Sequence, residues 1–206
     1  MIRDGALAAS GLLVEKIGGP GVRPVQPPGL WEALKFDNGD GQVFSAQEYA
    51  QDRGDALYRR SLYLFWKRAC PPPGMGTFDA PNREVCTLRR PRTNTPLQAL
   101  ELMNDAVYLE AARTLAERCM KGSPAEIATA IFRRVTARAP TTKELAVLLE
   151  LHRAQLDVYT KDVAAAKKLI AIGSANRDES LDVREHAAWT VVANLVLNLD
   201  EAVTKE

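Results

Sequence analysis

A change in residue pattern near Thr93 constrains the fold of this chain more than any other feature. After it, apolar residues recur every three or four positions, which is the spacing of amphipathic helices. Before it, glycine, proline and aromatic residues interrupt any such period. The sequence therefore predicts a single, mainly α domain over residues 1–206. We expect an antiparallel helical half at residues 93–206 and an irregular, basic and aromatic half at residues 1–92 that contains a small β element.

The helical half has clear start and stop signals. Capping residues followed by proline predict a helix from Pro96 to about Met120, whose apolar face includes Leu97, Leu100 and Met103. Ser123-Pro124 begins the next helix, which stops at Ala139-Pro140, and a capping box at Thr141–Glu144 begins a third. Two further helices are expected over Asp162–Ile172 and from Leu181 to about Val203. The expected inward-facing residues of the last two long helices are Leu145, Leu148, Leu149, Leu156, Tyr159, Ala188, Val191, Val192, Leu195 and Leu199, the last five around Trp189.

The first half is harder to assign. A helix is expected from Ile2 to about Val14, and an ordered extended loop over residues 18–28. Residues 34–36 and 42–44 flank the turn-forming sequence Asp37–Gly41, which predicts a hairpin. We also predict a strand over Ser61–Trp66, although apolar residues in this segment fit helical spacing as well.

Overall charge and targeting signals exclude little. Lys and Arg number 27 against 26 Asp and Glu, so no global charge attracts nucleic acid or an anionic membrane. Nucleic acid is therefore not an expected partner. No signal peptide follows Met1, and the longest uncharged apolar stretch, residues 187–199, is shorter than the about 20 residues that a membrane span needs.

Positive charge is instead concentrated between Arg59 and Arg92. Eight basic side chains face two acidic ones there, a local net charge of +6, with Tyr63, Phe65, Trp66 and Phe78 interleaved. Such a segment could hold an anion, a sugar ring or a single nucleic-acid strand by charge and stacking. Alternatively, its arginines pair with acids of the helical half and serve only to fix a loop.

Few residues in this segment suggest catalysis. Asp79 and Glu84 could act as an acid–base pair, or simply as ion-pair partners of the arginines. Cys86 lacks a histidine nearby in sequence that would activate it, so a buried structural thiol or a disulfide with Cys70 is favoured. His152 and His186 are isolated and suit surface or helix-packing roles. We therefore expect no metal site, and without a Cys-x-x-Cys-His sequence we expect no haem in this chain.

Three motifs carry a resemblance to a known family: Tyr58–Arg68, Thr77–Cys86 and Arg92–Leu100. In this order they resemble the planctomycete-specific domain of unknown function, and the likeness extends from about Ile2 to Glu206. That family's domain ends large exported proteins, usually downstream of planctomycete-type cytochrome c modules. The resemblance implies an extracytoplasmic location, whether periplasmic or secreted, with haem confined to the upstream modules.

The resemblance also implies a fragment. Family members carry a further helical stretch before the position of Met1, so the chain looks N-terminally truncated. Apolar surface would then be exposed, and we expect self-association. Asp79–Arg83 lies in the best-marked loop of the family, and Cys86 and Asn94 match its pattern. Cys70 does not match, which makes a Cys70–Cys86 disulfide less attractive.

These observations leave the activity uncharacterised and favour a non-enzymatic interaction or ligand-binding module of an exported multidomain protein. Its expected partner is an upstream cytochrome-type module or an anionic glycan. An enzyme acting on complex polysaccharide, sulfated or unsulfated, through Asp79 and Glu84 is the alternative, and a purely structural spacer is the third. The candidate ligand-binding residues are Arg83, Arg89, Arg90, Arg92, Asn82, Asn94 and Trp66.

Overall fold

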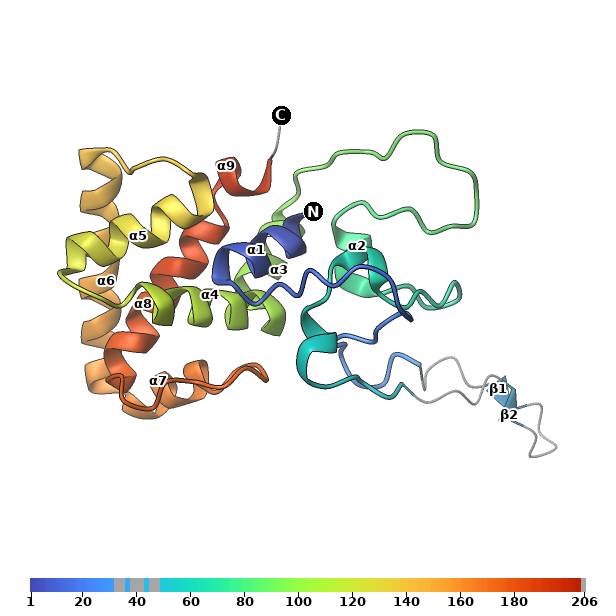
Figure 1. Ribbon diagram of the computed structural model, residues 1–206, viewed down its shortest axis with the longest axis horizontal. Helices are drawn as coiled ribbons and strands as arrows, with labels where there is room; N and C mark the ends of the chain where they lie inside the picture. The colour runs from blue at the N-terminus through green and yellow to red at the C-terminus, as the bar shows by residue number, and fades with distance from the viewer. Residues whose placement is uncertain (32–35, 38–42, 45–48, 205–206) are drawn as a thin grey trace. The chain divides into compact units, whose positions relative to one another are not determined.

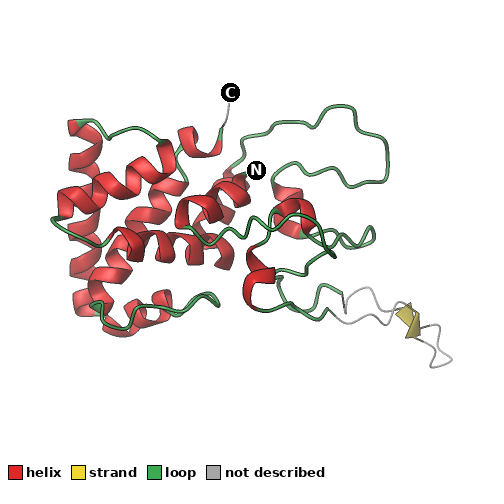
Figure 2. Ribbon diagram, viewed as in Figure 1, coloured by secondary structure: helices red, strands yellow, loops and turns green. Residues whose placement is uncertain are grey.

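The computed structural model describes residues 1–31, 36–37, 43–44 and 49–204. Helices predominate among the described residues and strands are few, which confirms the prediction of a mainly α fold (Figure 2). The chain divides into two compact units. Unit 1 combines Met1–Leu13 with Ala99–Glu206, and unit 2 is Val14–Gln98. The first residues of the chain therefore belong to the same unit as the last hundred.

Most of the regular structure lies in unit 1 (Figure 1). The helix α3 crosses from unit 2 into unit 1 at Gln98–Ala99. The helices have these bounds: α1 Ile2–Ser10, α2 Pro73–Thr77, α3 Pro96–Asn104, α4 Ala106–Cys119, α5 Pro124–Thr136, α6 Thr142–Lys161, α7 Val163–Ile170, α8 Val183–Leu197 and α9 Asp200–Val203.

The helix α8 forms the centre of unit 1. It packs against α4, α5, α6 and α7, and it is buried on nearly every side (Figure 1). A helix surrounded in this way is apolar around most of its circumference, so its sequence shows little one-sided periodicity. Trp189, Val192 and Val196 are essentially buried, whereas Leu195, expected to face inward, is 37% exposed. The prediction for Leu195 was therefore wrong, because the side of α8 that faces solvent is narrow and includes this residue.

Three helix ends differ from the sequence prediction. The expected helix from Pro96 to Met120 breaks at Asp105, which has an extended backbone and accepts a hydrogen bond from the Val107 amide at 2.8 Å. That residue caps α4 and separates it from α3. The helix α1 ends at Ser10 rather than near Val14, because Gly11 takes a left-handed conformation. The helix predicted from Leu181 to about Val203 is divided into two helices, α8 and α9.

The apolar face predicted for the start of α3 is not buried. Leu97, Leu100 and Met103 are between 52% and 60% exposed, in contrast to Leu102, which is buried. Self-association of the chain stays a prediction.

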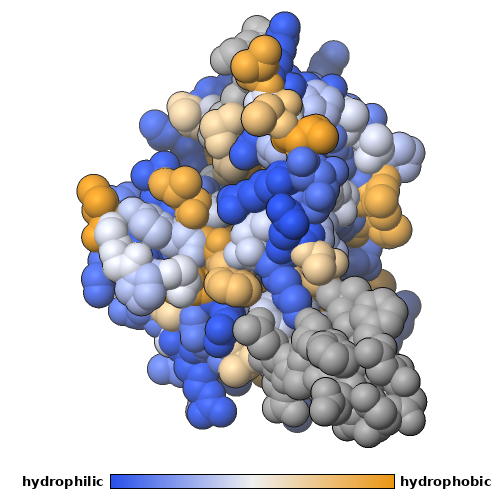
Figure 3. Space-filling model, turned by 90° about the vertical axis from the view of Figure 1, so that its right-hand side faces the viewer, coloured by the Kyte–Doolittle hydropathy of each residue, from blue (hydrophilic) through white to orange (hydrophobic). Residues whose placement is uncertain are grey.

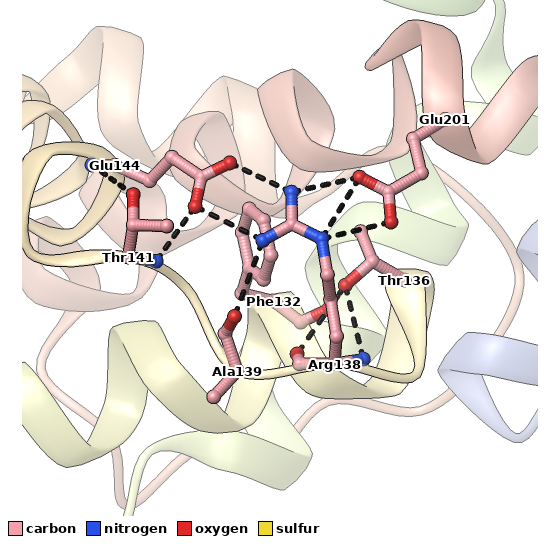
Figure 4. Close-up of polar contacts among 7 residues, drawn as sticks. All are labelled: Phe132, Thr136, Arg138, Ala139, Thr141, Glu144 and Glu201. Carbon is pink, nitrogen blue, oxygen red and sulfur yellow. Dashed lines mark hydrogen bonds and ion pairs between the residues drawn. The ribbon is translucent and has the colours of Figure 1, made fainter.

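Capping boxes at Ser123 and Thr141 begin α5 and α6, as predicted. Between these helices, Arg138 donates hydrogen bonds to both Glu144 of α6 and Glu201 of α9, and its guanidinium lies 4.8 Å from the centre of the Phe132 ring (Figure 4). The hydrogen bonds from Arg138 and then from Thr141 lower the pKa of Glu144 to about 2. One arginine thus joins the α5–α6 connection to the last short helix.

A buried polar cluster joins α4 to the connection between α7 and α8. The Glu110 carboxylate, 3% exposed, accepts hydrogen bonds at 2.6 Å from the Ser174 and Ala175 amides. Arg113, 1% exposed, donates to the Ala175 carbonyl at 2.7 Å, and His186 of α8 approaches the Arg113 carbonyl at 3.1 Å. Buried charges need such partners, and here the partners fix the course of an irregular segment.

Unit 2 has little regular structure and is held by polar and aromatic side chains. Arg59 is buried. Its guanidinium donates hydrogen bonds to the carbonyls of Lys16 and Gly18 at 2.9 and 2.5 Å and lies 3.9 Å from the centre of the Tyr63 ring. The Tyr63 hydroxyl accepts from the Gly18 amide at 2.9 Å. These contacts order the glycine-rich loop.

The strand predicted over Ser61–Trp66 was wrong. Ser61–Tyr63 form a 3₁₀ turn, and only an isolated parallel bridge joins Leu64 to Val22. The aromatic residues of the segment favour a strand by propensity, but here all three are half-buried and Phe65 packs on Trp31. The Trp31 ring lies 5.9 Å from Phe65 and 4.2 Å from the Lys67 ammonium.

The predicted hairpin is present in the part that the structure describes. The strand β1 (Phe36–Asp37) pairs antiparallel with β2 (Val43–Phe44), with Phe36 opposite Phe44 and Asp37 opposite Val43. The turn was expected at Asp37–Gly41, but Asp37 belongs to β1, and residues 38–41 lie outside the described residues.

Candidate functional site: an arginine-rich loop with a polar neck

The connection between α2 and α3 is a long loop (Figures 1 and 2), and hydrogen bonds of polar side chains close its base. Asp79 accepts hydrogen bonds from the Thr93 amide at 2.8 Å and from the Thr93 hydroxyl at 2.9 Å. The side-chain amide of Gln98, 4% exposed, donates to the Thr77 carbonyl and to the Thr93 hydroxyl, both at 2.9 Å. We call these four residues the neck and residues 80–92 the arginine loop. Long surface loops of this kind frequently carry function.

The arginine loop is exposed along most of its length. Every residue from Asn82 to Asn94 is exposed, including Arg83, Arg89, Arg90 and Arg92. Two apolar side chains of the same loop are exposed as well, Val85 at 71% and Leu88 at 105%. On the face drawn in Figure 3, hydrophobic residues lie in small groups separated by hydrophilic ones. A fully exposed leucine thus lies directly before Arg89 and Arg90 in this loop.

Arg83 of the loop lies over an aromatic ring. Its guanidinium lies 4.6 Å from the centre of the Trp66 ring, a cation–π distance. Its backbone has a φ of 66°, which is uncommon for a residue with a long side chain. Asn82 supports the turn by accepting a hydrogen bond from the Glu84 amide at 3.0 Å. The structure thus brings three predicted residues, Asn82, Arg83 and Trp66, close together.

Arg89, Arg90 and Arg92 form no ion pair with an acid in the part of the chain that the structure describes. Asn94 is exposed beside the neck. The positive charges of these arginines are therefore not neutralised by a described acid.

The two candidate acid–base residues have other partners. Glu84 lies 3.4 Å from the Arg68 guanidinium, with both side chains more than half exposed. Asp79 is bound by Thr93 in the neck rather than by an arginine. Asp79 also has a positive φ, 58°, which aspartate tolerates because its short side chain can bond locally. Each carboxylate therefore has a local structural contact that accounts for its position.

The cysteines differ from the expectation. All three are free thiols, and Cys86 is exposed, so neither a buried thiol nor a disulfide describes it. Its exposure follows from its place in the arginine loop. Cys119 is the buried thiol, and burial raises its pKa.

Both histidines pack between helices. His152 stacks on Trp189, with ring centres 3.9 Å apart, and His186 is completely buried. Burial lowers the pKa of His186. Among the described residues, no three His, Cys, Asp or Glu side chains gather as a metal site would require. The described helices are also too short or too polar to cross a bilayer.

The basic segment is not one continuous surface. Arg59 is 5% exposed and orders the glycine-rich loop, and Lys67 lies over Trp31. The exposed basic side chains of the segment are Arg60, Arg68, Arg83, Arg89, Arg90 and Arg92, and Arg68 lies beside Glu84. The four in the arginine loop follow Phe78, the last aromatic residue of the segment, whereas Arg59 and Lys67 lie among its earlier aromatic residues.

The buried polar residues that hold the irregular segments in place were not predicted from the sequence. Gln98 was expected only as part of a helix start, yet its buried amide closes the neck. Arg113 and Glu110 were missed in the same way as buried charges of α4. The sequence did contain an indication for Glu110 and Arg113, since Ala111, Ala112 and Leu115 place both charged residues beside the apolar face of the helix.

A comparison with protein-family models identifies the relationship. The model described as "PSD1: Protein of unknown function (DUF1553)" matches residues 1–152, about three quarters of the chain. The chain belongs to this family. The match includes the arginine loop and the neck, and it ends within α6 rather than at Glu206, where the motif resemblance was expected to end. No curated protein and no solved structure matches the chain. Membership of the PSD1 family therefore names no activity.

Proposed function

We propose that this member of the PSD1 family is a non-enzymatic binding module that holds an anionic ligand through its arginine loop. One observation carries this proposal: Arg89, Arg90 and Arg92 are exposed and form no ion pair with the described acids. Glu84 pairs with Arg68, and Asp79 belongs to the neck, so neither neutralises them.

A sulfated or carboxylated polysaccharide fits this chemistry. The guanidinium group presents a planar fork of donors that matches two oxygens of a sulfate or carboxylate. Arg83 is held on Trp66, so less side-chain entropy is lost when it binds. The neck fixes both ends of the loop, which limits the positions that the other arginines sample.

Docking to an acidic protein is the second candidate, and Leu88 favours it. A leucine with a completely exposed side chain offers an apolar anchor in the middle of a basic loop. The upstream cytochrome-type modules implied by the motif resemblance, in an extracytoplasmic parent protein, would be such partners. Polysaccharide hydrolysis through Asp79 and Glu84 has less support, since both carboxylates have structural partners.

The proposal is tested by a thermal-shift screen with sulfated, uronic and neutral oligosaccharides of equal length. A ligand that binds the folded chain raises its melting temperature. We expect stabilisation by the charged sugars only, and its loss in Arg83→Ala and Arg90→Ala. Arg153→Ala, which removes an exposed arginine of α6, is the matched control and should keep the shift.

Leu88→Ser separates the two candidates. It should leave glycan binding unchanged, because sugars gain little from an isolated leucine, and it should weaken docking to a protein. A shift that is equal for neutral and charged sugars, or that survives in Arg90→Ala, would contradict the proposal.

A further inference from the structure

The Arg89–Arg90 peptide bond lies in the least constrained stretch of the arginine loop. Residues 86–91 have no helix or strand, and all of them are exposed. Within the described residues, no backbone-to-backbone hydrogen bond involves this stretch. The residues of the neck, in contrast, are held by hydrogen bonds between Asp79 and Thr93 and between Gln98 and Thr77. An endoprotease binds its substrate as an extended segment, so such a stretch needs no unfolding before it can be cleaved.

Other arginines of the loop are less suitable. Arg90 precedes Pro91, whose ring and missing N–H hinder cleavage of the bond between them. Arg92 precedes Thr93, whose amide is bound to Asp79. Arg83 has a left-handed backbone, lies on Trp66 and is followed by Glu84.

Several arginines outside the loop are constrained as well. Arg113, Arg118 and Arg153 lie inside helices, where cleavage requires local unfolding. Arg59 is buried, and Arg23 exchanges backbone and side-chain hydrogen bonds with Asp52.

Cleavage after Arg89 would not remove either fragment's anchor. The N-terminal fragment carries α1, which packs on α4 within unit 1. Leu7 of α1 is completely buried, and Arg118 of α4 donates to the Ser10 carbonyl at 2.9 Å. Across the cut, Asp79 remains bound to Thr93 and Thr77 to Gln98.

We propose that the arginine loop is a processing site, at which an arginine-specific endoprotease converts the chain into a two-chain protein. Water adds across the Arg89–Arg90 peptide bond and leaves a carboxylate on Arg89 and an ammonium group on Arg90. Residues 1–89 and 90–206 then stay associated through α1 and the neck. This inference is independent of the ligand proposed above.

The test is limited digestion of the folded chain with an arginine-specific endoprotease, followed by intact-mass spectrometry over time. We expect a first cut after Arg89, at least about tenfold faster than at any helical arginine. Arg89→Gln should abolish this cut, and Arg153→Gln should leave its rate unchanged. A first cut at another arginine, or a rate that Arg89→Gln does not change, would overturn the proposed site.

Association is tested on the cleaved chain by size-exclusion chromatography. The two fragments should co-elute in buffer and separate in concentrated urea. Cleaved Leu7→Ala should separate at a lower urea concentration than the cleaved parent, because its α1 is held less tightly. Fragments that elute separately in buffer would overturn the two-chain product.

Discussion

Replacing Gly173 by alanine tests the buried polar cluster that fixes the α7–α8 connection. Gly173 has a φ of 99°, and an added Cβ would lie 2.5 Å from Oε1 of Glu110. The Glu110 carboxylate would have to move away from the Ser174 and Ala175 amides. It is buried at 3% exposure, so water does not replace these two hydrogen bonds.

Gly122→Ala is a matched control in the same unit. Gly122 has a φ of 96°, and its Cβ would lie 2.5 Å from Oε2 of Glu126. Glu126 would have to leave its capping contacts with Ser123, but it is exposed, so water replaces those hydrogen bonds. In both variants the left-handed backbone of the new alanine should lower the free energy of unfolding by about 1–2 kcal/mol. In Gly173→Ala the free energy of unfolding should fall by about 3 kcal/mol more, since hydrogen bonds to a buried charge contribute about 1.5–3 kcal/mol each.

Urea unfolding measures the difference. Trp189 is buried in unit 1, while Trp31 and Trp66 lie in unit 2, so fluorescence of a Trp31→Phe/Trp66→Phe background reports on unit 1. Gly173→Ala should show a clearly lower free energy of unfolding than Gly122→Ala in that background. Equal losses in the two variants would refute the assignment of Glu110 as a buried anchor of this connection.

Three further predictions follow from single contacts. Burial lowers the pKa of His186 below its ordinary 6.5, with Glu117, Arg113 and Arg177 around it. As the pH falls, the unfolded chain therefore takes up this proton at a higher pH than the folded chain does. The contribution of neutral His186 to the stability of unit 1 should be fully present above pH 6.5 and should be lost as the pH falls toward 5. Urea midpoints of the parent and of His186→Gln, measured across this pH range, would show this dependence. Asp105→Ala should destabilise the chain by about 1 kcal/mol, because α4 loses its cap, while Asp105→Asn should lose much less in the same urea titration. A maleimide should label Cys86 before Cys70 and leave Cys119 unlabelled until unfolding, which mass spectrometry of peptides can follow; early labelling of Cys119 would contradict its burial.

The helical unit was largely predictable because its signals are local. Ser123 and Thr141 begin helices through contacts with residues three positions later, and the sequence alone contains such pairs. The break at Asp105 was missed because an apolar period continues on both sides of it. Leu195 was wrongly predicted to be buried. Four helices enclose α8, so apolar residues lie all around it, and the periodicity of its sequence does not show which narrow side faces solvent.

The site was predicted by composition but not by contact. Arg83, Arg89, Arg90 and Arg92 were identified from local charge, and the structure leaves them exposed. Arg59, equally basic in sequence, is buried against carbonyl groups some forty residues earlier in the chain. Bonds of this kind, like those of the Gln98 amide to Thr77, depend on how distant loops meet. No short-range pattern encodes them.

The most direct test of the account is calorimetric titration of the chain with a sulfated hexasaccharide, comparing two double variants of equal charge. Arg89→Ala/Arg90→Ala removes two arginines of the loop, and Lys167→Ala/Lys168→Ala removes two exposed lysines of α7. Exposed ion pairs contribute about 0.2–1 kcal/mol each, so the arginine variant should bind about 2- to 30-fold more weakly than the parent. The lysine variant should bind like the parent. Equal weakening in both variants would mean that only net charge attracts the ligand, and it would contradict a binding site in the arginine loop.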